Sequence, residues 1–69
     1  MPKEITFEQL NDALLDRTIE IYQKKSGDDI KYKFRTKGML YTLKVPQDQV
    51  TKVENLISSN SKSLEIIPV

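Results

Sequence analysis

The sequence predicts a small α+β domain in which two helices cover one face of a mostly antiparallel sheet. Apolar residues recur with helical spacing near the amino terminus and again within residues 48–58, whereas residues 18–45 alternate between apolar and polar side chains. Gly27 and Gly38 divide the alternating region into three strands. At 69 residues the chain is expected to form one domain, spanning 1–69, with the element order αβββαβ.

The first helix is expected from residue 7 to residue 16. Thr6 is a candidate amino-terminal cap, with Gln9 three residues later as in a capping box. Ile5 and Leu10 occupy the positions of a hydrophobic staple around that cap. The apolar stripe of this helix consists of Phe7, Leu10, Ala13 and Leu14.

Three strands are expected to follow, at residues 18–25, around 30–36 and at 39–45. Ser26-Gly27 and Lys37-Gly38 are the candidate two-residue turns, since glycine adopts the positive φ that such turns require. With these turns, Ile19 would pair with Phe34, and all apolar strand residues would share one face. That core-facing set is Ile19, Ile21, Ile30, Tyr32, Phe34, Tyr41 and Leu43.

The remaining elements are a second helix and a short final strand. Pro46 ends the third strand because it cannot donate to a ladder. The helix is expected at residues 48–58, and the final strand at 63–69 with Leu64 and Ile66 on one face. The apolar stripe of the second helix consists of Val50, Val53 and Ile57, with Leu56 beside it.

Positive charge is concentrated in the middle of the chain. Residues 22–45 contain seven Lys or Arg and two acidic residues, whereas the rest of the chain carries a net charge of −4. The face opposite the helices is predicted to hold Glu20, Tyr22, Lys24, Lys31, Lys33, Arg35, Leu40, Thr42 and Lys44. The register places Lys31 opposite Lys44, a like-charge pair that destabilises a sheet by about 0.2–1 kcal/mol.

This basic face has two interpretations. Alternating lysines are common on the solvated side of a half-buried sheet. A basic stripe around a tyrosine also suits a nucleic-acid backbone with unpaired bases. Tyr22 either stacks on a base or packs over neighbouring lysine stems. Tyr32, Phe34 and Tyr41 are interpreted first as core residues, because they share the helix-covered face.

The composition gives little support to catalysis or metal binding. There is no His and no Cys, and the serines lack a basic partner of the kind that activates a nucleophile. Asp28 and Asp29 are adjacent in a strand, so their side chains point to opposite faces and fit salt partners better than a metal site. We expect no cofactor, no membrane segment and a cytoplasmic location, which agrees with the absence of Cys.

Two stretches carry a resemblance to a known family. Residues 30–36 (IKYKFRT), followed by residues 40–43 (LYTL), resemble the central hairpin of large-subunit ribosomal protein thirty-eight of eukaryotes and some archaea. The opening residues 1–5 (MPKEI), the length and the element order are similar as well. Met39 stands where that family often has an aromatic residue, and residues 15–20 are less basic than their counterparts.

The resemblance implies a structural, non-enzymatic constituent of the large ribosomal subunit in the cytoplasm. Its implied partners are large-subunit ribosomal RNA and neighbouring ribosomal proteins, with no membrane and no small-molecule substrate. Together with the predicted basic face, it suggests RNA contacts from Lys3, Tyr22, Lys24, Lys31, Lys33, Arg35, Lys37, Tyr41 and Lys44. The alternative function is a small protein-interaction module that docks an acidic protein partner.

Overall fold

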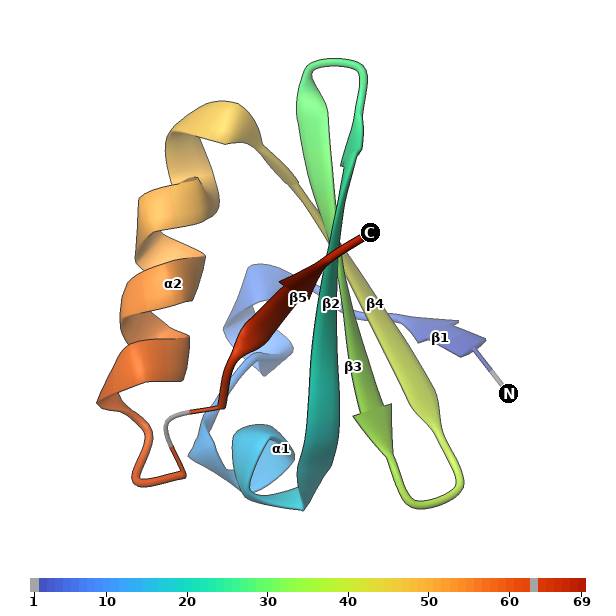
Figure 1. Ribbon diagram of the computed structural model, residues 1–69, viewed down its shortest axis with the longest axis vertical. Coiled ribbons are helices and arrows are strands. Elements are labelled where there is room, and N and C mark those ends of the chain that lie inside the picture. Colours follow the sequence, from blue (N-terminus) through green and yellow to red (C-terminus); the bar gives the residue numbers. More distant parts are fainter. Residues whose placement is uncertain (1, 63) are drawn as a thin grey trace.

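Two α-helices lie on the same face of a five-stranded sheet in the computed structural model, which describes residues 2–62 and 64–69 (Figure 1). The other face of the sheet carries no helix in this part of the chain. This arrangement confirms the predicted α+β class. The elements are β1 (Pro2–Glu4), the 3-10 helix η1 (Phe7–Gln9), α1 (Asp12–Arg17), β2 (Thr18–Ser26), β3 (Asp29–Thr36), β4 (Leu40–Pro46), the 3-10 helix η2 (Gln47–Gln49), α2 (Val50–Ser59) and β5 (Ile66–Pro68).

The centre of the sheet is an antiparallel meander, and its two edges are parallel additions. The strand order is β1-β4-β3-β2-β5, with β1 parallel to β4 and β5 parallel to β2. Strand β1 was not expected, because Pro2–Glu4 shows no alternation of its own. It is held in the extended conformation by pairing with β4, and the Ile5 N–H continues this pairing by donating to the Thr42 carbonyl oxygen at 2.9 Å.

The first helical segment is divided, so the prediction of one helix over residues 7–16 was wrong. The Thr6 N–H donates to the Gln9 side-chain oxygen at 2.8 Å, as the capping motif requires, but this turn ends as a short 3-10 helix. Leu10 is extended, and the Asn11 side chain then caps a new helix by accepting the Leu14 N–H at 3.0 Å. The cap at Asn11 explains why α1 begins at Asp12.

The first hairpin turns one residue later than predicted, at Gly27-Asp28 rather than Ser26-Gly27, so most β2 residues pair two positions further along β3 than predicted. Ser26 pairs with Asp29, and Ile21 pairs with Phe34. Gly27 has φ 62°, a left-handed conformation at the first turn position that favours glycine. Because the pairing is shifted by two residues and not by one, Ile21 still faces the core.

A β-bulge at the start of β2 removes Ile19 from the core, which corrects the prediction for that residue. The register skips from the Thr18–Thr36 pair to the Glu20–Arg35 pair. Thr18 is fully buried, with its hydroxyl donating to the Leu14 carbonyl at 2.8 Å, whereas Ile19 is 54% exposed. The hydroxyl of Thr18 therefore satisfies a carbonyl group in the last turn of α1.

The second hairpin has the predicted register. Phe34 pairs with Tyr41 and Lys31 pairs with Lys44 across a turn at Lys37-Gly38. Gly38 has φ 105°, and the Thr36 N–H closes the turn by donating to the Met39 carbonyl at 2.9 Å. This hairpin is the frame that positions the basic face.

The core lies between the meander and the two helices. Tyr32 and Phe34 are fully buried and their rings stack at a centroid distance of 6.4 Å. The predicted stripe of the second helix is confirmed, with Val53 and Ile57 buried on α2. The buried apolar residues are Leu10, Leu14, Leu15, Ile21, Ile30, Tyr32, Phe34, Leu43, Val45, Val53 and Ile57. Leu15 was not anticipated, because the expected stripe ran through Leu14 alone at this end of the helix.

The final strand is shorter than the predicted range of residues 63–69. Strand β5 covers Ile66–Pro68, and Ser63, where the prediction began, lies outside the described residues. Leu64 and Ile66 pack against the core, as expected from their shared face.

Candidate nucleic-acid interface

Three lysines lie side by side on the sheet face that carries no helix. Lys24 on β2 pairs with Lys31 on β3, and Lys31 pairs in turn with Lys44 on β4. Neighbouring strands are about 4.8 Å apart, so the three side chains begin at that spacing across the sheet. We call Lys24, Lys31 and Lys44 the lysine row.

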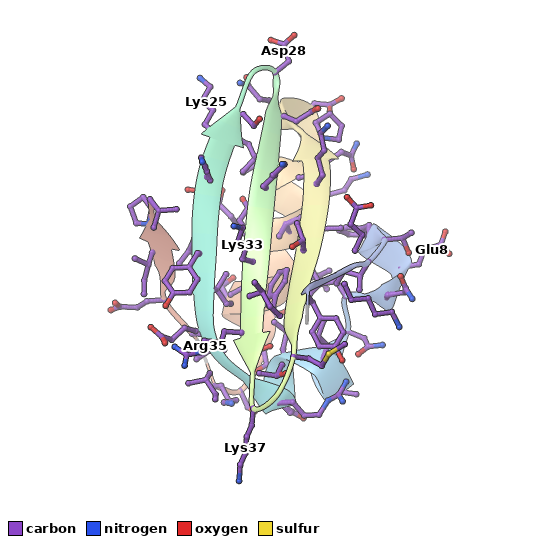
Figure 2. The ribbon with its side chains drawn as sticks, turned by 90° about the vertical axis from the view of Figure 1, so that its right-hand side faces the viewer. Glu8, Lys25, Asp28, Lys33, Arg35 and Lys37 are labelled. Carbon is purple, nitrogen blue, oxygen red and sulfur yellow. The ribbon has the colours of Figure 1, made fainter. Side chains whose placement is uncertain are left out.

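The next row along the sheet adds another cation between two side chains that can form hydrogen bonds. Lys33 pairs with Tyr22 on one side and with Thr42 on the other. Figure 2, which views the sheet from this face, shows Lys33 near the middle of the central strand β3. A shallow depression on this face is lined by Lys3, Glu4, Lys24, Ser26, Lys31, Lys33 and Thr42.

Most of this positive charge has no carboxylate partner. Lys44 Nζ lies 3.5 Å from Asp29 Oδ2, and both side chains are partly exposed. Within residues 2–62 and 64–69, Lys24, Lys31 and Lys33 form no salt bridge. The lysine row therefore combines like-charge repulsion with positive charge that a carboxylate compensates at Lys44 alone, and such a surface meets the electrostatic requirement for binding a polyanion.

At the other end of the face, Glu20 organises a small polar cluster. Its carboxylate accepts from Arg35 Nη1 at 3.1 Å through one oxygen and from the Tyr22 hydroxyl at 2.8 Å through the other. The hydrogen bond to Glu20 is the main cause that raises the pKa of the Tyr22 hydroxyl above its ordinary value. Tyr22 is half-buried and pairs with Lys33 between β2 and β3, and its hydroxyl is already engaged by Glu20.

The structure brings together only part of the set of candidate contacts. Tyr22, Lys24, Lys31, Lys33, Arg35 and Lys44 share the open face. Lys37 lies in the turn between β3 and β4 and points away from the sheet (Figure 2). Tyr41 pairs with Phe34 and packs against the core, on the helix-covered side. Lys3 pairs with Tyr41 on edge strand β1 and reaches the depression on the open face from there.

Three residues of the depression were not among the candidate contacts, although one of them, Thr42, had been placed on the open face. Glu4 reaches the depression because β1 pairs with β4, and no local sequence pattern predicts this pairing. Ser26 reaches it because the hairpin turns at Gly27-Asp28. A preference for Gly-Asp over Ser-Gly as a turn would have placed Ser26 correctly.

The described residues show neither a metal-binding cluster nor a membrane-spanning helix. Residues 2–62 and 64–69 contain no group of three or more acidic residues that could hold a metal ion. Asp28 lies in the first turn and points away from the sheet (Figure 2), while Asp29 contacts Lys44. None of the described helices has the length and apolar character needed to cross a bilayer.

Comparison with known proteins gives one informative relative. No protein-family model matches the chain. The chain is 37% identical over 51 residues to large ribosomal subunit protein eL38 of the archaeon Aeropyrum pernix. The aligned region covers 74% of this chain and 76% of that relative.

Proposed function

The chain belongs to the family of large ribosomal subunit protein eL38, and from this premise we propose that it is a structural constituent of the large ribosomal subunit that binds ribosomal RNA. In this proposal the contact surface is the open face of the sheet. The partners are large-subunit ribosomal RNA and neighbouring ribosomal proteins, and the location is the cytoplasmic ribosome. The role is structural and involves no catalysis.

The observation that carries this proposal is the lysine row. Three adjacent strands each contribute one lysine to the same row, and Lys33 stands beside it. Of these four lysines, only Lys44 has a carboxylate partner among the described residues. A protein that did not bind an anion would gain stability by replacing Lys31, which has a lysine on both sides, with a neutral residue.

Lysine is suited to phosphate contacts that do not depend on base sequence. Its ammonium group is a compact charge on a flexible stem, with three donors that can adapt to phosphate oxygens. Contacts of this kind fix the position of a protein on RNA but carry no sequence information. Selectivity would then come from the shape of the folded RNA and from surrounding proteins.

RNA binding would also compensate the small size of the domain. A chain of about this length buries only roughly 60% of the surface that its unfolded form exposes. A partner that binds only the folded state stabilises it by mass action. The repulsion between Lys24, Lys31 and Lys44 would be removed at the same time, since phosphates would lie among the three ammonium groups.

Sedimentation of a tagged copy through a sucrose gradient, under conditions that separate the ribosomal subunits, tests this function. We expect the wild-type protein to comigrate with the large subunit through a moderate-salt wash. The double variant Lys31→Ala/Lys33→Ala should be released at lower salt, whereas Lys52→Ala on α2 should not. Recovery of the wild-type protein only at the top of the gradient would overturn the ribosomal assignment. Equal retention of the double variant and of Lys52→Ala would overturn only the assignment of the open face as the contact surface.

A further inference from the structure

The β-bulge at the start of β2 presents an isoleucine to solvent. Strand alternation would place Ile19 on the same face as the buried Ile21, but the register skips Ile19 and leaves it 54% exposed. Bulges commonly redirect a side chain near a functional surface. Exposure of a large aliphatic side chain forgoes much of the stabilisation that its burial would provide.

Ile19 lies in a shallow depression at the end of the sheet where β3 turns into β4. Met39 and Leu40, both partly buried, provide further apolar lining. Arg35 and Lys37 line the same depression, and Figure 2 shows both at this end of the sheet, with Lys37 at the tip of the turn. No acidic residue of the described chain lines it. The depression thus combines an aliphatic floor with a cationic rim.

These features favour an acidic protein segment over RNA as the occupant. Unpaired bases stack on aromatic rings or on guanidinium planes. The floor is formed by Ile19, Met39 and Leu40, none of which is aromatic, and the Arg35 guanidinium is already held by Glu20 at 3.1 Å. An aliphatic side chain can bind to such a floor through burial of apolar surface alone. Neighbouring carboxylates would complement the positive charge of the rim.

We propose that this depression is a second interaction surface, which binds an acidic segment of a partner protein through an aliphatic anchor residue. Ile19, Met39 and Leu40 receive the anchor. Lys37, which forms no salt bridge within residues 2–62 and 64–69, attracts the flanking carboxylates. The depression contains no member of the lysine row, so this proposal stands whether or not that row binds ribosomal RNA.

The test uses the purified full chain and two fluorescein-labelled peptides, one of alternating Glu and Leu and one of alternating Glu and Ser. Anisotropy titrations measure the affinity of each peptide for the wild type and for Ile19→Ser. Burial of the Ile19 surface predicts about tenfold weaker binding of the Glu/Leu peptide to Ile19→Ser. The matched control is Val69→Ser, which alters another exposed apolar residue (70% exposed) and should leave the affinity unchanged. Circular dichroism verifies that both variants are folded.

Three results would overturn the proposal. The first is equal binding of the two peptides, which would show that no aliphatic anchor is recognised. The second is a loss of peptide binding in Lys31→Ala as large as in Ile19→Ser, since the peptide would then be bound by the open face. The third is weaker binding of single-stranded oligouridine to Ile19→Ser than to the wild type, with the Glu/Leu peptide unaffected, which would assign the depression to RNA.

Discussion

Lys62 Nζ lies 2.7 Å from the main-chain carbonyl oxygen of Thr18, although the two residues are far apart in the sequence. The same ammonium group donates to the Asp16 carbonyl oxygen at 2.9 Å. Both acceptors lie where α1 ends and β2 begins, and a cation near a helix carboxyl terminus is stabilising. One lysine therefore ties the segment after α2 to the corner between α1 and β2.

Replacement of Lys62 by methionine should lower the free energy of unfolding by about 1–3 kcal/mol, because charge-assisted hydrogen bonds to two carbonyl groups are lost. Urea denaturation measures this difference. Lys52→Met is the control, since it removes a lysine from the exposed side of α2, for which no hydrogen bond is found in the described residues. Equal midpoints for the two variants would show that the Lys62 contacts contribute no net stability.

Neutralisation of Lys31 should have opposite effects on stability and on RNA binding. Lys31→Gln removes two like-charge pairs, with Lys24 and with Lys44, so the isolated protein should gain about 0.2–1 kcal/mol per pair at low salt. The same variant should bind ribosomal RNA more weakly. The slope of log affinity against log salt concentration should become shallower by roughly 0.7–0.9.

Urea denaturation at two salt concentrations and a filter-binding titration provide both readouts for Lys31→Gln. The stability gain should shrink at high salt, because screening already weakens the repulsion. A variant that is destabilised at low salt would contradict the assigned repulsion. An unchanged salt slope would contradict a phosphate contact from Lys31.

Glu20 is expected to restrain RNA binding by holding Arg35. Glu20→Gln removes a carboxylate from the open face and frees the guanidinium, so affinity for ribosomal RNA should rise by about two- to fivefold. The pKa of Tyr22 should fall towards its ordinary value, because the bond to the Glu20 carboxylate is the first cause of its rise. Ultraviolet titration of the tyrosines and an RNA-binding titration test the two effects, and weaker binding by Glu20→Gln would refute the restraint.

Alkaline pH should destabilise the fold through Tyr32. Burial is the main cause that raises the pKa of this tyrosine, and the hydrogen bond from Gln23 Nε2 at 2.9 Å opposes it. A raised pKa of an acidic group means that the unfolded chain releases its proton first. The contribution of neutral Tyr32 to the free energy of unfolding is therefore fully present below about pH 10 and is lost as pH rises through the pKa of the folded state.

The variant Tyr32→Phe isolates this contribution. At pH 8 the variant should lose about 0.5–1.5 kcal/mol with its hydrogen bond to Gln23. Between pH 8 and pH 11 its stability should fall less than that of the wild type, since the other titrating groups are common to both proteins. Urea denaturation at the two pH values makes the comparison, and identical falls would contradict the role of Tyr32.

Sequence patterns predicted the parts of the fold that depend on local signals. The predicted register of the second hairpin and the predicted apolar stripe of α2 were correct, since Gly38 marks a turn and Val53 and Ile57 recur at helical spacing. The first hairpin was misplaced because Gly27 was assigned to the second turn position and occupies the first. The predicted residues nevertheless lie on the open face, because the pairing of β2 with β3 differs from the prediction by two positions, an even number.

The features that escaped prediction depend on contacts between distant segments. Strand β1 exists through its pairing with β4, and the bulge at Ile19 accommodates the buried Thr18 and its bond to Leu14. Neither feature has a periodic signal in the sequence. The depression that contains Ile19 was missed for the same reason, since alternation assigned this residue to the core.

The two parallel edge strands have a consequence for the order of folding. The meander of β2, β3 and β4 is continuous in sequence and joined by two-residue turns, so its contacts require only short loop closures. Pairing of Pro2 with Leu40 and of Ile21 with Ile66 closes much longer loops. We expect the meander to form first and both edges to dock later, with correspondingly earlier hydrogen exchange from the edge amides. The row formed by Lys24, Lys31 and Lys44 would then be complete early, so an assembling RNA could select the chain before its outer strands are in place.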